Sequence, residues 1–177
     1  MPKHFPDSVD PWHLLDREQV IQGELKLAAL SRLSPLLHDN GGEERVGFSL
    51  SFHRDQDRRA VVHCKIKATL VLTCQRCLEP MSMPLEIDSR LALVNGIEEA
   101  ERLPEDLEPL MLEEDAALHI AELVEDELLL AIPDAPRHIE ADCAQGQDEC
   151  LDEVMEHTQV AEANPFDVLA VLKKTVT

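Results

Sequence analysis

Alternating apolar and polar positions predict two neighbouring β-strands in the first half of the chain. In residues 46–53 the apolar side chains fall on every second position, which is the period of a strand with one buried face. Residues 62–73 repeat this pattern. The polar run 54–59 between them has a length that closes a hairpin. We therefore expect an antiparallel pair whose apolar face lies in the core.

A third strand is predicted after Pro84, where leucine and isoleucine side chains share one face as far as the turn at 95–96. Three successive strands joined by short connections indicate an antiparallel meander. Its solvated face is expected to carry His63, Lys65 and Lys67.

The hydrophobic period becomes that of a helix between Ala116 and Ile132. Asp115 is placed to cap the N-terminus of this helix, and Pro133 stops it. We expect this long helix to cover the apolar face of the sheet. Its acidic side chains are assigned to the solvated side of the helix; they are Glu122, Glu125, Asp126 and Glu127.

Two shorter helices are predicted towards the chain ends. Residues 25–37 place four leucines in helical register. Near the C-terminus, Asn164-Pro165 has the form of an N-cap followed by proline at the first helical position. This terminal helix either docks on its own domain or engages a partner. Its candidate partner contacts are Asn164, Pro165, Phe166 and Leu169.

These elements predict an α+β fold: an antiparallel β meander packed by a long helix, with an acidic irregular segment and short terminal helices. Residues 1–44 are expected to form an N-terminal extension with a short helix, packed on the domain. Residues 45–133 form the core of sheet plus helix. Residues 134–163 are acidic and lack a clear period, so they are expected to be irregular, and residues 164–177 form the C-terminal helix motif.

Charge is distributed unevenly over the 177 residues. The formal net charge is −20, from 16 Lys+Arg and 36 Asp+Glu. Residues 45–90 carry eight Lys or Arg against five acids, whereas residues 96–162 carry 22 acids against two Arg. A strongly acidic surface repels phosphate, which argues against the whole molecule being a nucleic-acid clamp. The acidic half is either a solubilising surface or a surface that attracts a basic protein.

The sequence gives no indication of a membrane span or an export signal. Its apolar runs are far too short to cross a bilayer, and its first residues lack the apolar core of a signal peptide. We therefore expect a soluble cytoplasmic protein. In such a compartment a disulfide framework is the less favoured use of its five cysteines.

The sharpest chemical motif is Cys74-Gln75-Arg76-Cys77, placed where a strand gives way to a turn. Two cysteines with this spacing can share one tetrahedral ion, but they supply only half of a zinc site. His138 and Cys143 lie beyond the helix with ordinary zinc-ligand spacing, and Cys150 is a further candidate. The hypothesis is one zinc ion bound by Cys74, Cys77, His138 and Cys143. The alternatives are structural thiols without metal, and a redox dithiol, which normally opens a helix in a βαβ unit.

No motif for catalysis is found. Gly-rich phosphate loops, nucleophile elbows and paired-histidine metal helices are missing from the sequence, so we predict a protein that is not an enzyme and has no cofactor beyond the hypothetical zinc. A small basic patch can contact RNA phosphate, without the aromatic platforms that stack on bases. Its members are Arg54, Arg58, Arg59, Lys65, Lys67 and Arg76.

Four separated segments together resemble the YceD family, described as large ribosomal RNA subunit accumulation proteins. They are residues 72–77, 108–109, 122–133 and 164–169, in the same order and with similar spacing, and the regions around Asp10-Pro11 and Gly23 also agree. The resemblance implies a bacterial cytoplasmic factor, with relatives in plastids, that supports synthesis, processing or stability of the large-subunit 23S rRNA. It assigns no catalytic residues. Some relatives have extra cysteines after the helix that complete a zinc knuckle, and this chain departs from them.

Two mechanisms fit the implied function. In the first, the acidic half binds a basic large-subunit ribosomal protein and shields it until it meets RNA. In the second, the basic face of the sheet binds rRNA or a pre-ribosomal particle directly. The charge balance favours the first.

Overall fold

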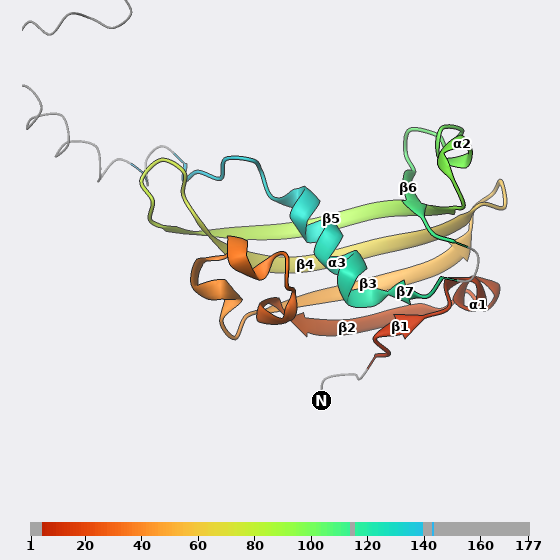
Figure 1. Ribbon diagram of the computed structural model, residues 1–177, viewed down its shortest axis with the longest axis horizontal. Helices are drawn as coiled ribbons and strands as arrows, with labels where there is room; N and C mark the ends of the chain where they lie inside the picture. Colours follow the sequence, from red (N-terminus) through yellow and green to blue (C-terminus); the bar gives the residue numbers. More distant parts are fainter. Residues whose placement is uncertain (1–4, 114–115, 140–142, 144–177) are drawn as a thin grey trace, which may run out of the picture. The chain divides into compact units, whose positions relative to one another are not determined.

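The computed structural model describes residues 5–113, 116–139 and 143. Its centre is a five-stranded sheet in the order β2-β3-β4-β5-β6 (Figure 1). Each pair from β2 to β5 is antiparallel, and β6 runs parallel to β5. The bounds are Val20–Lys26 for β2, Arg45–Arg54 for β3, Ala60–Thr73 for β4, Pro80–Val94 for β5 and Glu108–Met111 for β6. The predicted meander is confirmed as β3, β4 and β5, and an unpredicted strand extends it at each edge.

Short elements surround this sheet. The α-helices are α1 (Pro11–Asp16), α2 (Ile97–Ala100) and α3 (Ile120–Ala131). Three 3₁₀ turns, η1 (Leu27–Ala29), η2 (Ser34–Leu36) and η3 (His38–Gly41), follow β2. A separate two-stranded pair joins β1 (Ser8–Val9) to β7 (Leu118–His119). None of the described helices is long and apolar enough to cross a membrane.

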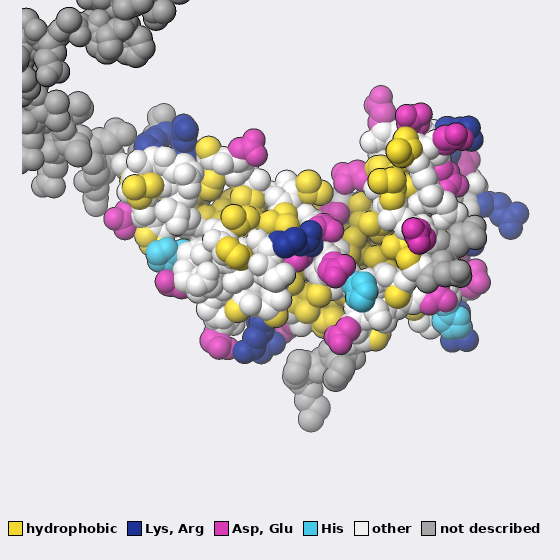
Figure 2. All heavy atoms as spheres, in the orientation of Figure 1, with side chains coloured by type: hydrophobic (Ala, Val, Ile, Leu, Met, Phe, Trp, Pro, Cys, Tyr) yellow, Lys and Arg dark blue, Asp and Glu magenta, His cyan; other side chains and the backbone are white. Residues whose placement is uncertain are grey.

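The two faces of the sheet differ as the alternating pattern predicts. On the core face, Val62 lies opposite Leu91 and Ile66 lies opposite Ile87. On the other face, Lys65 lies opposite Asp88, in contact with solvent. Helix α3 lies across the core face, and Figure 2 shows hydrophobic side-chain atoms gathered beside it. The apolar residues of β3, β4 and β5 therefore form the base of a core that other segments must cover.

The tolerance of β5 for Pro84 follows from the strand order. Strand β5 begins at Pro80, earlier than predicted, and Pro84 pairs with Thr69. Proline has no backbone N–H to donate to a neighbouring strand, so it is found where one side of its strand is unpaired. Strand β6 pairs only with Leu91–Val94, so the proline lies where β5 has β4 as its one described neighbour.

The predicted long helix is wrong in its extent. Helix α3 has 12 residues and begins at Ile120, with His119 at its N-cap position. Residues 118–119 are extended because they pair with Ser8 and Val9. Strand pairing requires extended φ and ψ angles, which are incompatible with a helix at these two positions, so the tertiary pairing overrides the helical period. Asp115, the predicted cap, lies outside the described residues.

The predicted helix over residues 25–37 is also wrong. Leu25 belongs to β2 and pairs with Val46. After β2 the segment forms the short 3₁₀ turns η1 and η2 with a turn between them, and it ends at Leu37, which bridges to Leu72. Pro35 lies inside the segment, where it would remove a helical hydrogen bond. The four leucines that suggested the helix are nevertheless buried in the core; they are Leu27, Leu30, Leu33 and Leu37.

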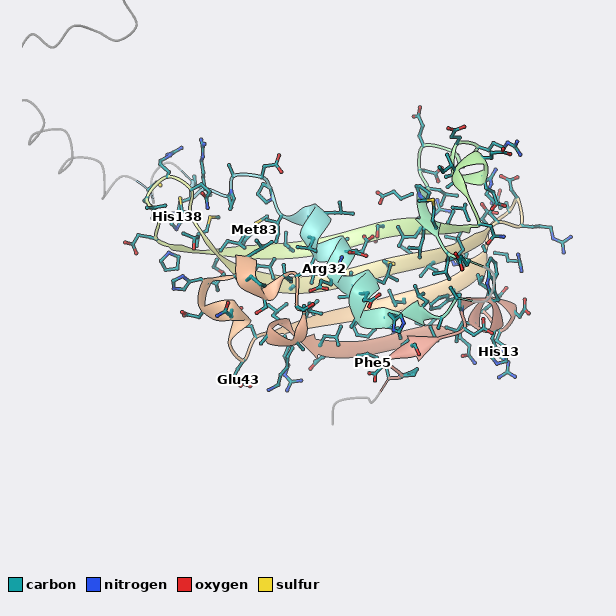
Figure 3. The ribbon with its side chains drawn as sticks, viewed as in Figure 1. Phe5, His13, Arg32, Glu43, Met83 and His138 are labelled. Carbon is teal, nitrogen blue, oxygen red and sulfur yellow. The ribbon has the colours of Figure 1, made fainter. Side chains whose placement is uncertain are left out.

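A buried carboxylate joins these turns to helix α3. Glu125 is 4% exposed. Its Oε1 accepts hydrogen bonds from the backbone N–H groups of Arg32 and Leu33 at 2.7 and 3.1 Å, and its Oε2 accepts from Arg32 Nε at 3.0 Å. Figure 3 shows Arg32 beside the helix. Burial opposes ionisation of Glu125, but the N–H groups of Leu33 and Arg32 and the guanidinium lower its pKa below the ordinary value.

A second buried acid on the same helix has the opposite character. Glu127 is 6% exposed, and its Oε2 accepts a hydrogen bond from the hydroxyl of Ser89 in β5. Burial raises the pKa of Glu127, the Ser89 hydroxyl lowers it by less, and the charges of Glu108 and Asp126 raise it further. The assignment of Glu125 and Glu127 to the solvated side of the helix is therefore wrong. The sheet contacts one side of helix α3, and the segment between η1 and η2 contacts another side. Helix α3 therefore faces buried surroundings on two sides.

The two buried acids should respond in opposite ways to loss of charge. Glu125→Gln removes the charge from three charge-assisted hydrogen bonds, so we expect the free energy of unfolding at pH 7 to fall by about 2 kcal/mol. Glu127→Gln removes a poorly solvated charge and keeps an acceptor for Ser89, so we expect a change of less than about 1 kcal/mol, towards greater stability. Urea denaturation of both variants measures these changes.

The pH dependence of the free energy of unfolding tests whether the charge of Glu125 stabilises the fold. The depressed pKa of Glu125 means that its ionised form stabilises the fold above the ordinary carboxyl pKa, and that this contribution is lost as the pH falls. The gap between wild type and Glu125→Gln should therefore stay constant from pH 7 to about pH 5 and narrow as the pH falls below the ordinary carboxyl pKa of 4.5. A gap that stays constant or widens below that pH would contradict a stabilising charge on Glu125.

Candidate metal centre

The connection between β4 and β5 folds into a tight knuckle. The backbone N–H of Cys74 donates to Glu79 O at 2.9 Å, and the N–H of Leu78 donates back to Cys74 O at 2.9 Å. The N–H of Arg76 points at Cys74 Sγ, 3.5 Å away. Leu78 closes the turn with φ at +63°, in the left-handed region that glycine favours. This geometry turns Cys74 and Cys77 to the same side of the loop.

The segment that follows helix α3 lies alongside the knuckle. The N–H of Gln75 donates to Pro136 O at 2.8 Å, and the N–H of His138 points at Cys74 Sγ at 3.5 Å. Figure 3 shows His138 at this end of the sheet, next to the β4–β5 connection. These backbone contacts bring residues that are about 60 positions apart in sequence within reach of one ion.

The predicted ligands come together in one cluster. The potential ligand atoms of Cys74, Cys77, His138 and Cys143 all lie within 4.8 Å of one another. Cys77 Sγ and His138 Nδ1 are 3.4 Å apart. Four ligands at about 2.0–2.3 Å from a tetrahedral ion would lie roughly 3.5–3.8 Å from each other, so the cluster needs little contraction to hold one.

The protonation of the cluster suits a ligand role. Burial opposes ionisation of Cys74, but the backbone N–H groups of Cys77, His138 and Arg76, together with the Cys77 side chain, lower the pKa of this thiol to about 5. His138 Nε2 lies 3.2 Å from Pro80 O and is the ring nitrogen placed to donate to it. In the neutral tautomer with its proton on Nε2, the ring presents the Nδ1 lone pair, on the side of Cys77, to a metal.

The cluster can therefore hold a metal ion. Three sulfur ligands and one imidazole suit an ion that prefers tetrahedral sulfur and nitrogen coordination. The backbone bonds to Cys74 and the carbonyl partner of His138 are the outer contacts that orient ligands in such centres.

Known proteins were compared with the chain as a whole. Residues 62–173 match the protein family described as "Large ribosomal RNA subunit accumulation protein YceD". The chain belongs to the YceD family. A curated protein of Haemophilus influenzae, named "Large ribosomal RNA subunit accumulation protein YceD", is 32% identical over 170 residues, which cover 96% of this chain and 97% of the relative. No solved structure matches. The resemblance drawn from the sequence motifs is confirmed, and the YceD match contains all four residues of the cluster.

The structure does not gather the six predicted RNA contacts into one patch. Arg54, Arg58 and Arg59 lie at the β3–β4 turn, and Arg76 lies in the knuckle at the opposite end of β4. Strand β4 has 14 residues, which corresponds to about 45 Å. Lys65 and Lys67 lie between these ends on the solvated face of the sheet.

Cross-strand partners reduce the positive charge of that face. Lys65 Nζ lies 3.6 Å from Asp88 and Lys67 Nζ lies 2.7 Å from Glu86. His63 also contacts the Asp88 carboxylate. The side chains predicted for partner binding, Asn164, Pro165, Phe166 and Leu169, lie outside the described residues. So does Cys150, the other candidate metal ligand.

Sequence reasoning missed the groups that position the ligands. Pro80 and Pro136 act through their carbonyl oxygens, and Leu78 acts through its backbone conformation. None of these roles depends on a side chain with recognisable metal chemistry. Cys64 of strand β4 is fully buried in the core, as its place in the alternating pattern predicts. Burial raises the pKa of its thiol to about 12.

The conformation of Leu78 generates a stability prediction. Its side chain is 72% exposed and its φ is positive, so it loses little packing but bears the steric cost of the left-handed region. We expect Leu78→Gly to raise the free energy of unfolding by up to about 1 kcal/mol. Thermal or urea denaturation measures the change.

Leu130 provides a matched control because it is 77% exposed but lies in helix α3. Leu130→Gly should lower stability by roughly 0.5–1 kcal/mol, since glycine is unfavourable in a helix. Equal destabilisation by both variants would show that the positive φ of Leu78 carries no strain.

Proposed function

We propose that this chain is a non-enzymatic factor that supports accumulation of the large-subunit rRNA by binding a basic ribosomal protein. Its membership of the YceD family supports the first part of this proposal, because the curated relative is named for large ribosomal RNA subunit accumulation. The observation that carries the second part is an acidic surface with exposed apolar side chains, formed by residues 97–111.

This segment, called here the acidic lobe, comprises α2, β6 and the connection between them. It contains one basic residue, Arg102. Ile97 and Met111 are 68% and 62% exposed. Figure 2 shows acidic and hydrophobic atoms side by side at this end of the molecule. All six acids of the lobe are exposed; they are Glu98, Glu99, Glu101, Glu105, Asp106 and Glu108.

Such a surface suits a protein partner with Lys or Arg side chains. The acids attract the basic partner and orient it, and the exposed apolar side chains add contact area. A bare acidic face would serve solubility alone, whereas large apolar side chains among the charges are unfavourable in water unless a partner covers them. The lobe therefore favours protein capture over a purely solubilising role.

Direct binding of rRNA by the solvated face of the sheet is the second mechanism. It gains less support, because Lys65 and Lys67 are paired with Asp88 and Glu86. Each phosphate that approaches these lysines must compete with a carboxylate already in place. The acidic-lobe mechanism therefore remains our proposal.

We further propose that the ion of the metal centre is zinc, with a structural role. The donor set of Cys74, Cys77, His138 and Cys143 is typical of closed tetrahedral zinc sites. Zinc would bind through the three thiolates and His138 Nδ1, and would fix the segment after α3 to the β4–β5 knuckle. No step of the proposed function requires chemistry at the ion.

The acidic lobe can be tested by neutralising three of its acids. Glu98, Glu101 and Glu105 are exposed, and their replacement by Gln should weaken binding to purified basic large-subunit ribosomal proteins by roughly tenfold at low salt. Calorimetry measures the binding. The same variant should restore large-subunit rRNA less well than wild type in cells that lack the protein.

A second triple variant separates local from overall charge. Glu18, Glu44 and Glu79 are also exposed but lie outside the lobe, and replacing them by Gln changes the net charge by the same amount. Binding should stay close to that of wild type. Equal losses in the two variants would mean that the lobe is not the docking surface.

The zinc proposal predicts about one zinc ion per purified chain. Cys74→Ser should lower the zinc content well below that level and lower the melting temperature, whereas Cys64→Ser, which alters a core thiol outside the centre, should keep the zinc. Elemental analysis and thermal denaturation measure the two effects. A purified wild-type chain that holds no zinc and does not take it up would refute this proposal.

A further inference from the structure

A pocket of about 280 Å³ lies at the end of the sheet opposite the metal centre. Its walls come from α1, the β3–β4 turn, the end of β5, α2 and the segment that follows α2. Four arginines line it: Arg54, Arg58, Arg59 and Arg102. In an acidic chain this is an unusual concentration of guanidinium groups around one hollow.

The pocket is rich in hydrogen-bond donors and poor in free acceptors. Besides the four guanidinium groups, Trp12 lines it, and the buried Nε1 of Trp12 has no hydrogen-bond partner among the described residues. The one carboxylate in the lining, Glu99, already accepts the N–H of Asn95 at 2.8 Å.

Two of the arginines are held in place by ion pairs. Arg59 lies 3.2 Å from Asp55 and 2.9 Å from Asp57, and Arg54 lies 3.8 Å from Asp16. These acids offset part of the local positive charge. They also restrict the guanidinium groups, which lowers the entropy lost when a ligand binds.

The other two arginines supply the uncompensated charge. Neither Arg58 nor Arg102 forms an ion pair within the part of the chain that the structure describes. Both side chains are exposed at the rim of the pocket. They can therefore approach an anion without first leaving a carboxylate.

The backbone at Arg58 gives an independent indication. Its φ is +65°, and the turn is fixed by the Arg58 N–H donating to Asp55 O and the Asp55 N–H donating to Arg59 O. Glycine or asparagine would occupy such a position with less strain. An arginine at this strained position is consistent with a requirement for its side chain.

We propose that this pocket binds a phosphate group of an RNA chain. Phosphate offers several acceptor oxygens and a negative charge, which match the guanidinium donors of the pocket. The site adds an RNA contact to the proposed role in rRNA accumulation and rests on that role only for the source of the phosphate. The acidic lobe and this pocket share Glu99, Arg102 and Leu103. The acids tested in the lobe, Glu98, Glu101 and Glu105, do not line the pocket, so each proposal can fail while the other stands.

Trp12 is the one tryptophan in the chain, and its fluorescence therefore reports on the pocket directly. The full-length protein would be titrated with inorganic phosphate, with adenosine 5′-monophosphate and with a short single-stranded oligoribonucleotide, with calorimetry in parallel. We expect all three to change the fluorescence, and the oligoribonucleotide to bind at least tenfold more tightly than inorganic phosphate. Equal affinity for the oligoribonucleotide and inorganic phosphate would overturn the RNA assignment in favour of a free anion.

Variants decide whether the arginines are responsible. Arg102→Gln should weaken oligoribonucleotide binding at least fivefold, and Arg58→Gly should do the same while raising the melting temperature, because it relieves the strained backbone. Arg137→Gln is the matched control, since Arg137 is exposed near the metal centre at the other end of the sheet. The proposal is overturned if no probe binds at millimolar concentration, or if Arg137→Gln weakens binding as much as Arg102→Gln.

Discussion

The carboxylate of Glu125 joins the two segments that cover the core face of the sheet. Helix α3 has only 12 residues, so it cannot cover the apolar face of strands as long as β4 and β5. The segment of residues 27–37 after β2 completes the cover with its buried leucines. The backbone N–H groups of Arg32 and Leu33 in this segment donate to the Glu125 carboxylate instead of to a strand or helix backbone. A buried acid that satisfies these groups lets an irregular segment form part of a core.

The sequence predicts the parts of the fold in which the local period and the tertiary structure agree. Strands β3 and β4 follow the alternating pattern because one face is buried along most of their length, and in β5 the alternating positions are half-buried as far as Ser89. The N-terminal leucines are buried as their spacing implies, but Pro35 prevents the helix that the same spacing suggests. The burial of Glu125 could not be predicted, since its partners lie more than 90 residues away.

The candidate metal ligands could be predicted because a tetrahedral ion demands particular residue types at close spacing. Cys74 and Cys77 give the knuckle, and His138 with Cys143 completes the set that the structure brings together. The basic patch was less predictable. Strand register places Asp88 beside Lys65 and Glu86 beside Lys67, and register follows from the pairing of two strands rather than from either one alone.

The β4–β5 hairpin sets the separation of the candidate sites. The metal centre begins immediately after Thr73, and the arginine pocket begins at Ala60, with continuous pairing from Val61 to Thr73 between them. That length corresponds to roughly 40 Å of rigid strand. No small ligand can contact both ends, so a molecule that does so must be extended, as an RNA segment or a ribosomal protein tail is. The acidic lobe lies at the same end of the sheet as the pocket. A basic protein on the lobe would neutralise acids that otherwise repel an RNA phosphate approaching the pocket, so the two proposed partners would favour each other's binding.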